Sequence, residues 1–228
     1  PEGKARSEKN LGVVTTLDNK EVVRSAKTVV LAVKPQFYEE VLDEVHDSLT
    51  EEHTIIGIAP GKTLAWLKEK AGLPLKVVRF MPNTPAQVGE GMTAVCANER
   101  VSQEELAEIL KITDSFGCTE VIPERLMDAA GAVGGCAPAY VFMFIEAMAD
   151  AAVSQGMPRK QAYKFASQTV LGSAKMVLET GKHPGELKDM VCSPAGTTIE
   201  AVRVLEEKGF RSSVIEAMKT CEEISKSM

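Results

Sequence analysis

The sequence has 228 residues, of which 44% are hydrophobic and 25% are charged, as is usual for a soluble globular protein. A net charge of −6 and a pI near 5.3 argue against nucleic acid or an anionic membrane as the main partner. The five cysteines form no C-x-x-C pair and have no histidine at ligand spacing, which indicates reduced thiols rather than disulfides or a metal site. We therefore expect a cytoplasmic protein without nucleic-acid, membrane or metal partners.

The first half alternates short apolar runs with amphipathic helices. A weakly strand-like segment at 12–16 comes first, and three apolar runs then predict strands at 28–33, 54–59 and 76–81. Apolar residues at helical spacing follow Phe37 and Leu64. Two further runs, at 92–97 and 119–122, flank a helix that begins with the capping box Ser102-x-x-Glu105. This alternation predicts a doubly wound parallel sheet over residues 1–122.

The second half, residues 123–228, predicts helices only. Pro138 suits the first turn of a helix that ends near Gly156, and Pro158 begins another that reaches Gly181. The first of these helices, PAYVFMFIEAMADAAV, is apolar nearly all round, and a chain of this size has little protein left to cover it. We expect a buried helix rather than a membrane span, covered by a second copy of the chain. The predicted fold is α/β followed by all-α, with dimerisation through the helical half.

Turn-forming residues follow three of the predicted strands, as AVKPQ at 32–36, IAPGK at 58–62 and MPNTP at 81–85. Open α/β sheets bind ligands beyond the carboxyl ends of their strands, so Lys34, Gly61 and Asn83 could line a nucleotide site, although such loops are commonly rich in proline and glycine. The sequence contains no G-x-G-x-x-G motif, which holds a pyrophosphate at a helix N-terminus. Either the protein binds no dinucleotide, or its opening strand–helix–strand unit is missing from the chain.

Other candidate groups indicate structure more than chemistry. Glu146 and Asp150 lie one helical turn apart, but without a neighbouring histidine a structural hydrogen-bonding role is favoured over a metal site. No serine or cysteine has an obvious base partner, and Cys192 is expected to pack rather than react.

The segment CSPAGTTIEAV, at 192–202, joins a loop of small and hydroxyl residues directly to a helix. The spacing Thr197-x-x-Glu200 predicts a capping box. Outward-facing N–H groups at the positive end of the helix suit a small anion. A well-capped surface helix is the alternative interpretation.

Taken in order, these segments resemble pyrroline-5-carboxylate reductases from about Leu11 to Ser225. The most specific part is PGELKDMVCSPAGTTIEAVRVLE at 184–206, which fits the family signature throughout; VKP, MPNTP followed by VGEGMTA, and GGCAPAYVFMFIEAMADAAV occur in the family's order and spacing. The resemblance implies a Rossmann-type domain at 1–122, incomplete at its N-terminus, and a helical substrate-binding and dimerisation domain at 123–228, often assembled as a ring of dimers. It also implies hydride transfer from NADPH or NADH to the C=N bond of 1-pyrroline-5-carboxylate, giving L-proline in the last step of proline synthesis.

The same resemblance implies the site residues. The substrate carboxylate would be held in the 192–202 loop by Ser193, Gly196, Thr197 and Thr198, with Thr198 also near the ring nitrogen as the catalytic residue. The cofactor cleft would be lined by Ala32, Lys34, Pro35, Ala59 and Asn83. Tyr140, with Gly134 and Gly135, is expected near the dimer interface.

Three features depart from the family. Pro60 removes an N–H at the cofactor cleft, and Ala195 replaces a frequent glycine in the carboxylate loop. The missing glycine motif is the largest departure, so we expect the chain to lack most of its pyrophosphate site, and its activity as it stands is left open. Residues 5–7 are interpreted as a remnant of the loop that contacts the adenosine ribose or its 2′-phosphate.

Two alternatives stay open. One is another two-domain nicotinamide enzyme like the β-hydroxyacid dehydrogenases, which use a lysine on a helix; Lys164 and Lys175 lie on a predicted helix but lack glycine-rich neighbours. The other is a non-enzymatic oligomerisation protein with a vestigial α/β half.

Overall fold

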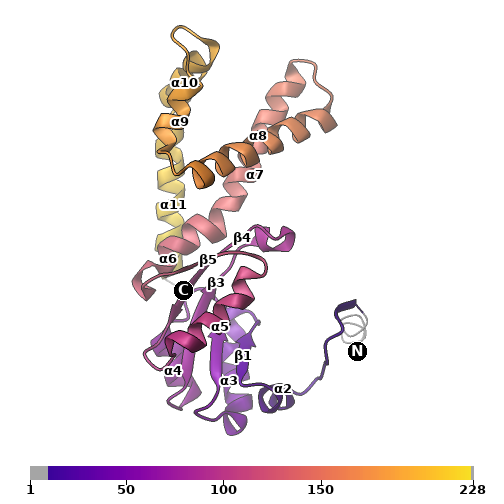
Figure 1. The fold of residues 1–228 in the computed structure, drawn as a ribbon, viewed down its shortest axis with the longest axis vertical. Helices are drawn as coiled ribbons and strands as arrows, with labels where there is room; N and C mark the ends of the chain where they lie inside the picture. The colour runs from indigo at the N-terminus through magenta and orange to yellow at the C-terminus, as the bar shows by residue number, and fades with distance from the viewer. Residues whose placement is uncertain (1–9, 227–228) are drawn as a thin grey trace. The chain divides into compact units, whose positions relative to one another are not determined.

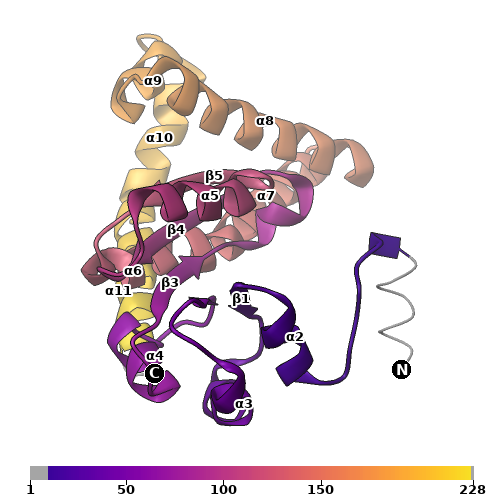
Figure 2. The ribbon, with the colours of Figure 1, turned by 60° about the horizontal axis from the view of Figure 1, so that its bottom comes forward.

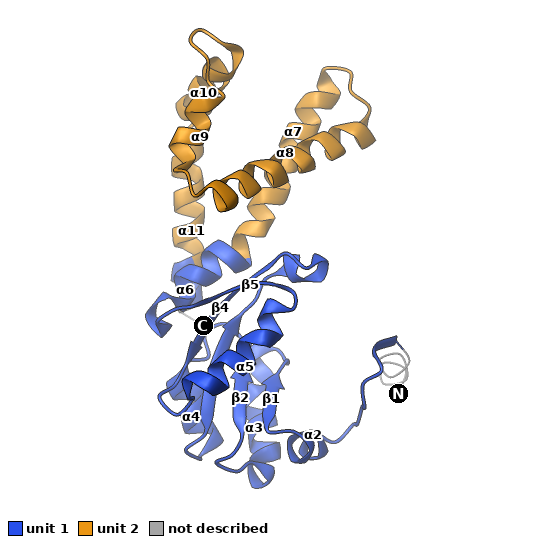
Figure 3. Cartoon of the chain, in the orientation of Figure 1, with its two compact units in different colours: residues 1–135, 222–228 blue, residues 136–221 orange. Residues whose placement is uncertain are grey.

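The computed structural model describes residues 10–226, which form two compact units (Figure 3). Unit 1 consists of Pro1–Gly135 with Glu222–Met228, and unit 2 consists of Cys136–Cys221. The chain therefore leaves unit 1 within the glycine-rich segment and returns to it along the last helix. The 5–7 segment proposed to contact the ribose lies outside the described residues.

Unit 1 is built on a five-stranded sheet in the order β1-β2-β3-β4-β5 (Figure 1). The strands are β1 (Thr28–Leu31), β2 (Thr54–Gly57), β3 (Lys76–Met81), β4 (Gly91–Ala97) and β5 (Gly117–Val121), within two residues of the predicted ends. All neighbouring pairs are parallel except β3 and β4, which are antiparallel. The prediction of a wholly parallel sheet is wrong at this pair, because residues 82–90 leave no room for a crossover helix.

The helices of unit 1 cover both faces of this sheet (Figure 2). They are α2 (Asn19–Ser25), α3 (Tyr38–Val45), α4 (Leu64–Ala71), α5 (Gln103–Asp114) and α6 (Met127–Ala130), with short 3-10 helices at Pro35–Phe37, His46–Ser48, Thr84–Val88 and Glu124–Leu126 and a π-helical segment at Gly131–Cys136. Helices α2, α3 and α4 pack on one face through a core that includes Val29 and Ile55, and α5 packs on the other over Ile56 and Val78. Successive residues of one strand thus face opposite layers, as both-sided burial requires.

Local sequence patterns correctly predicted one end of each of two helices, but wrongly predicted one strand. The capping box of Ser102 and Glu105 is confirmed at the start of α5, and α4 ends at Gly72 in the left-handed conformation, with φ of 66°. The strand-like segment at 12–16 is not a strand in the described chain, and Val14 is 98% exposed. A β-branched pattern alone does not make a strand, because a strand also requires a neighbouring strand on which to pack and pair.

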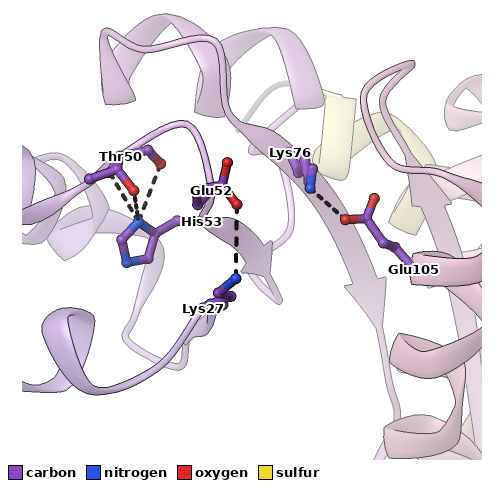
Figure 4. A network of polar contacts seen from close by, with 6 residues as sticks. All are labelled: Lys27, Thr50, Glu52, His53, Lys76 and Glu105. Atoms are coloured by element: carbon purple, nitrogen blue, oxygen red, sulfur yellow. Dashed lines mark hydrogen bonds and ion pairs between the residues drawn. The ribbon is translucent and has the colours of Figure 1, made fainter.

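Several polar contacts lie at the amino-terminal edge of the sheet (Figure 4). Lys27 pairs with Glu52 at 3.9 Å, and Lys76 pairs with Glu105 across to α5. His53 is buried; its Nδ1 accepts the backbone N–H of Thr50 at 3.0 Å, so Nε2 carries the proton and donates to Val23 O at 3.1 Å. These side chains therefore make structural contacts at this edge of the sheet.

Unit 2 is entirely helical, as predicted. Its helices are α7 (Ala137–Ser154), α8 (Arg159–Thr180), α9 (Pro184–Met190), α10 (Thr197–Glu207) and α11 (Phe210–Lys226), the last of which returns to unit 1. Pro138 lies in the first turn of α7, and α8 ends at Gly181 with φ of 64°, which confirms both predicted boundaries. Helices α7 and α8 pack together where small residues, Ala149 and Ala162 among them, let the backbones approach.

The apolar surface of α7 is largely uncovered in a single chain. Phe142 is 60% exposed and Met143 is 67% exposed, whereas Ala149 is fully buried. Within the described residues one helical stretch, Glu124–Ser154, is long and apolar enough to cross a membrane by length and composition, and 11% of its most apolar window is buried. The helix expected to be covered by a second copy is thus largely exposed in one chain, and α7 needs a covering surface from elsewhere.

Candidate functional site

The carboxyl ends of β1, β2 and β3 lie level with one another. Leu31 is in register with Gly57, and Gly57 with Arg79. The loops that follow, at 32–36, 58–62 and 81–85, are called the strand-end loops below. Because parallel strands deliver their following residues to one edge, these loops form a common border to the sheet, where open α/β sheets bind ligands.

The hydroxyl of Tyr38 joins the first two strand-end loops. Tyr38 is completely buried; its hydroxyl donates to Leu31 O at 2.7 Å and accepts the N–H groups of Ile58 and Ala59 at 2.9 and 3.0 Å. Burial raises the pKa of the Tyr38 phenol above its usual value, and the two N–H donors oppose that rise. Sequence reasoning missed this residue, because an aromatic side chain in the first turn of a helix ordinarily signals only core packing.

Four of the predicted cofactor residues lie in the loops after β1 and β2, which the Tyr38 hydroxyl joins. Ala32 and Lys34 are exposed, Pro35 is half-buried at the start of a 3-10 helix, and Ala59 is 6% exposed. Within residues 10–226, the Lys34 ammonium has no acidic partner. The second loop adds Lys62, whose Nζ lies 4.4 Å from the centre of the Trp66 ring. The first two strand-end loops therefore carry the positive charges of Lys34 and Lys62, beside a backbone that Tyr38 holds in place.

The predicted cofactor residue Asn83 serves the structure as well. Its Oδ1 accepts the N–H of Met92 at 2.9 Å, and its Nδ2 donates to Gly134 O at 3.1 Å. An amide has two N–H donors, so one of them stays available to a ligand. Asn83 thus ties the third strand-end loop to β4 and to the glycine segment before α7.

A buried ion pair behind the loops was also missed. Arg79, on β3, is 4% exposed, and its Nη1 donates to Glu124 Oε1 at 2.8 Å. The same carboxylate oxygen accepts the N–H of Leu64, the first residue of α4, at 2.7 Å. A signal for it existed, because a lone arginine within the apolar strand KVVRFM requires a buried anionic partner.

The predicted carboxylate loop lies in unit 2, before α10. Ser193, Thr197 and Thr198 are exposed, and Gly196 precedes the first helical residue. Gly196 N–H donates to Ser193 O at 3.0 Å, and a side chain at Gly196 would collide with Ser193 Oγ. The loop therefore keeps its hydroxyls and the first N–H groups of α10 open to solvent.

One expectation about this loop is wrong. The capping box does not form: Gly196, not Thr197, is the N-cap residue, no side chain caps α10, and Glu200 instead accepts a hydrogen bond from Arg203 Nε at 2.9 Å. The replacement of glycine by Ala195 falls at a position where the backbone has positive φ. Ala195 has φ of 55° and is the only non-glycine residue with positive φ in the described chain, a conformation that glycine adopts without steric cost.

Two other residues singled out in the sequence, Asp150 and Tyr140, contact side chains of the same unit. Asp150 pairs with Arg159, whose guanidinium also lies over the Tyr163 ring. The Tyr140 hydroxyl lies 2.9 Å from the sulfur of Cys221. Among the described residues no group of three or more histidine, cysteine, aspartate or glutamate side chains could hold a metal ion. The predicted cofactor residues thus belong to unit 1 and the predicted carboxylate residues to unit 2.

Comparison with known proteins identifies the family to which the chain belongs. A family model described as "Pyrroline-5-carboxylate reductase dimerisation" matches residues 124–228, and one described as "NADP oxidoreductase coenzyme F420-dependent" matches residues 1–61. The chain is 54% identical to the Escherichia coli pyrroline-5-carboxylate reductase over 228 residues, covering 100% of this chain and 85% of that protein. The chain belongs to the pyrroline-5-carboxylate reductase family. The relative from Methanosarcina acetivorans is 44% identical over 96% of this chain and 81% of that protein.

Solved structures of the family share the fold. The Plasmodium falciparum pyrroline carboxylate reductase with NADP bound matches with a TM-score of 0.89 at 35% identity, over 96% of this chain and 83% of that one. The Coxiella burnetii pyrroline-5-carboxylate reductase matches with a TM-score of 0.90 at 35% identity, over 96% and 82%. The predictions of a Rossmann-type half, a helical dimerisation half and a nicotinamide-dependent oxidoreductase are confirmed, and neither alternative gains support. The predicted domain boundary at 122/123 stays a prediction.

Proposed function

We propose that the chain reduces 1-pyrroline-5-carboxylate to L-proline, with NADPH or NADH as hydride donor, as the last step of proline biosynthesis. The observation that supports this most strongly is the 54% identity to the Escherichia coli reductase, which runs through both units. It covers the strand-end loops and the 192–202 segment alike.

The strand-end loops have the chemistry that a nicotinamide dinucleotide requires. Its phosphates are anionic, and Lys34 offers an exposed ammonium with no acidic partner among residues 10–226. The backbone beside Ala59 is fixed by Tyr38, and Asn83 keeps one amide N–H for a ligand. We assign cofactor contacts to Ala32, Lys34, Pro35, Ala59 and Asn83.

The loop before α10 suits the substrate carboxylate. Thr197 and Thr198 supply hydroxyl donors, and the 11-residue helix α10 directs its unpaired N–H groups and positive dipole end to the same place. Hydrogen bonds to a charged group are about twice as strong as neutral ones. Ser193 and Gly196 complete the set, because Gly196 leaves room for the Ser193 hydroxyl, with which a Cβ at this position would collide.

When bound, the reduced nicotinamide supplies the hydride for the C=N carbon of the ring. The chain's own contribution is binding and orientation: the loop holds the carboxylate, and Thr198 fixes the ring nitrogen so that the imine carbon keeps one orientation. A protonated imine arrives from solution with its proton in place, so no general acid is required. Holding two reactants in a reactive arrangement supplies most of the rate.

We also propose a homodimer, assembled further into a ring of dimers, in the cytoplasm. The apolar surface of α7, where Phe142 is 60% exposed, is the surface that a second copy would cover. The match of residues 124–228 to a dimerisation model supports the dimer. We expect neither a membrane nor a nucleic acid as partner.

Steady-state kinetics of Thr198→Ala test the assignment. Loss of a hydroxyl bonded to a charged group costs about 1.5–3 kcal/mol, so kcat/KM for pyrroline-5-carboxylate should fall about ten- to a hundredfold while the KM for NADPH stays unchanged. Thr169→Ala, which removes a hydroxyl bonded only to Phe165 O on α8, is the matched control. Unchanged kcat/KM in Thr198→Ala would refute the role of Thr198, and wild-type protein without proline formation would refute the proposed reaction.

A further inference from the structure

The hydrogen bonds of Tyr38 occupy a position that the β-ladder does not reach. Regular pairing of β1 with β2 ends at Leu31 and Gly57. Beyond that pair, the Tyr38 hydroxyl links Leu31 O to the N–H groups of Ile58 and Ala59, so one side-chain oxygen replaces the next rung of the ladder. A phenol has one donor and two acceptor positions, and all of them are used here.

The ring of Tyr38 leaves this oxygen little freedom. Tyr38 is 0% exposed, and its ring lies against Trp66 with 6.4 Å between ring centres. A side chain at Gly57 would meet Leu67 at 2.9 Å and the Tyr38 ring at 3.7 Å, so the packing around the phenol is tight. The hydroxyl is therefore held in place by the core, and it in turn holds the two loops.

We propose that Tyr38 is a positioning residue for the nicotinamide cofactor, because its hydroxyl sets the spacing between the Ala32–Lys34 backbone and the Ala59–Gly61 backbone. The inference rests on the proposed function. The tethered residues Leu31 and Ala59 adjoin or belong to the assigned cofactor set, and both are nearly fully buried. Without the hydroxyl, a carbonyl and two N–H groups lose their partner, and such groups recover hydrogen bonds only by moving toward water.

Tyr38→Phe isolates the oxygen, because the ring and its packing remain. Tyr163→Phe is the matched control, since Tyr163 is 39% exposed and lies on α8 in unit 2. The full chain without ligand is compared by amide hydrogen exchange, and NADPH is titrated by fluorescence. We expect faster exchange at Ile58 and Ala59, NADPH binding weakened roughly tenfold, and an unchanged KM for pyrroline-5-carboxylate in Tyr38→Phe only.

The outcomes separate the two proposals. If wild-type protein forms proline with NADPH and Tyr38→Phe binds NADPH as tightly as wild type, Tyr38 is structural only and the inference is overturned while the function stands. If wild-type protein binds neither NADPH nor NADH, the proposed function fails and the inference fails with it. A second measurement needs no variant: saturating NADPH should slow exchange at Ile58 and Ala59 in the wild type, and unchanged exchange overturns the inference even if Tyr38→Phe does not fold.

Discussion

Removing the carboxylate of Glu124 should destabilise unit 1 far more than removing a surface carboxylate. The Arg79 side chain is 5% exposed and the Glu124 side chain 33% exposed, and Glu124 Oε1 also accepts the N–H of Leu64. Glu124→Ala leaves a buried guanidinium unpaired, at a cost of about 3–5 kcal/mol, and takes the acceptor from Leu64, at a cost of about 1–3 kcal/mol. Because one oxygen serves both donors, the two costs overlap rather than add, and we expect about 4 kcal/mol.

The chain offers its own probe and its own control for this experiment. Trp66, the single tryptophan, lies on α4 two residues after Leu64, so its fluorescence during urea unfolding reports on unit 1. Glu52→Ala removes one carboxylate of an exposed pair in unit 1, with side chains 75% and 84% exposed, and should cost less than about 1 kcal/mol. Glu124→Gln, which keeps an oxygen for Leu64, should fall between the two. A free energy of unfolding within about 1 kcal/mol of wild type for Glu124→Ala would refute the reasoning.

Other single substitutions test the buried thiol, the carboxylate loop and the face of α7. Burial raises the pKa of Cys96 from 9.0 to about 11, so the folded chain holds this proton more tightly than the unfolded chain, and stability is lost as pH rises from 9.0 toward 11. In urea unfolding, Cys96→Ala should remove up to about 3 kcal/mol of that loss, and a pH dependence in Cys96→Ala equal to that of wild type would contradict this assignment. Ala195→Gly should be neutral or stabilise by up to about 1 kcal/mol, since relief of about 1–2 kcal/mol at a positive φ outweighs about 0.4–1 kcal/mol of glycine entropy. Ala174→Gly, inside α8, should destabilise by about 1 kcal/mol, and the same sign at both positions would contradict the strain at Ala195. Phe142→Glu should convert the dimer to monomers in sedimentation velocity, whereas an intact dimer would place the interface elsewhere.

Local patterns predicted the elements well where the local sequence alone decides the conformation. The apolar run at 28–33, the box at Ser102 and the proline at 138 each specify a strand, a helix start or a first turn without help from distant residues. The equivalent box at Thr197 failed, because the left-handed Ala195 directs the chain so that Gly196 becomes the N-cap. Ser102 and Thr197 each precede a glutamate by three residues, but the backbone before the two helices differs.

Partners far apart in the sequence were beyond local patterns. The antiparallel β4 could have been anticipated from the short connection between β3 and β4, because parallel strands need a longer crossover. The hydroxyl of Tyr38 could not, because its role depends on a residue 20 positions away in the chain. Arg79 signalled that an anionic partner was needed, but the sequence did not show that Glu124, 45 positions away, is that partner. The candidate site residues came from a family resemblance, and the structure adds the side chains that hold them.

Transfer of deuterium to proline tests the central claim most directly. The full chain is incubated with 1-pyrroline-5-carboxylate and NADPH deuterated at the transferring carbon, and the product is analysed by mass spectrometry and NMR. The account predicts L-proline with a single deuterium on the ring carbon that formed the C=N bond. Unlabelled proline, or no proline while NADPH and L-proline both bind, would contradict it.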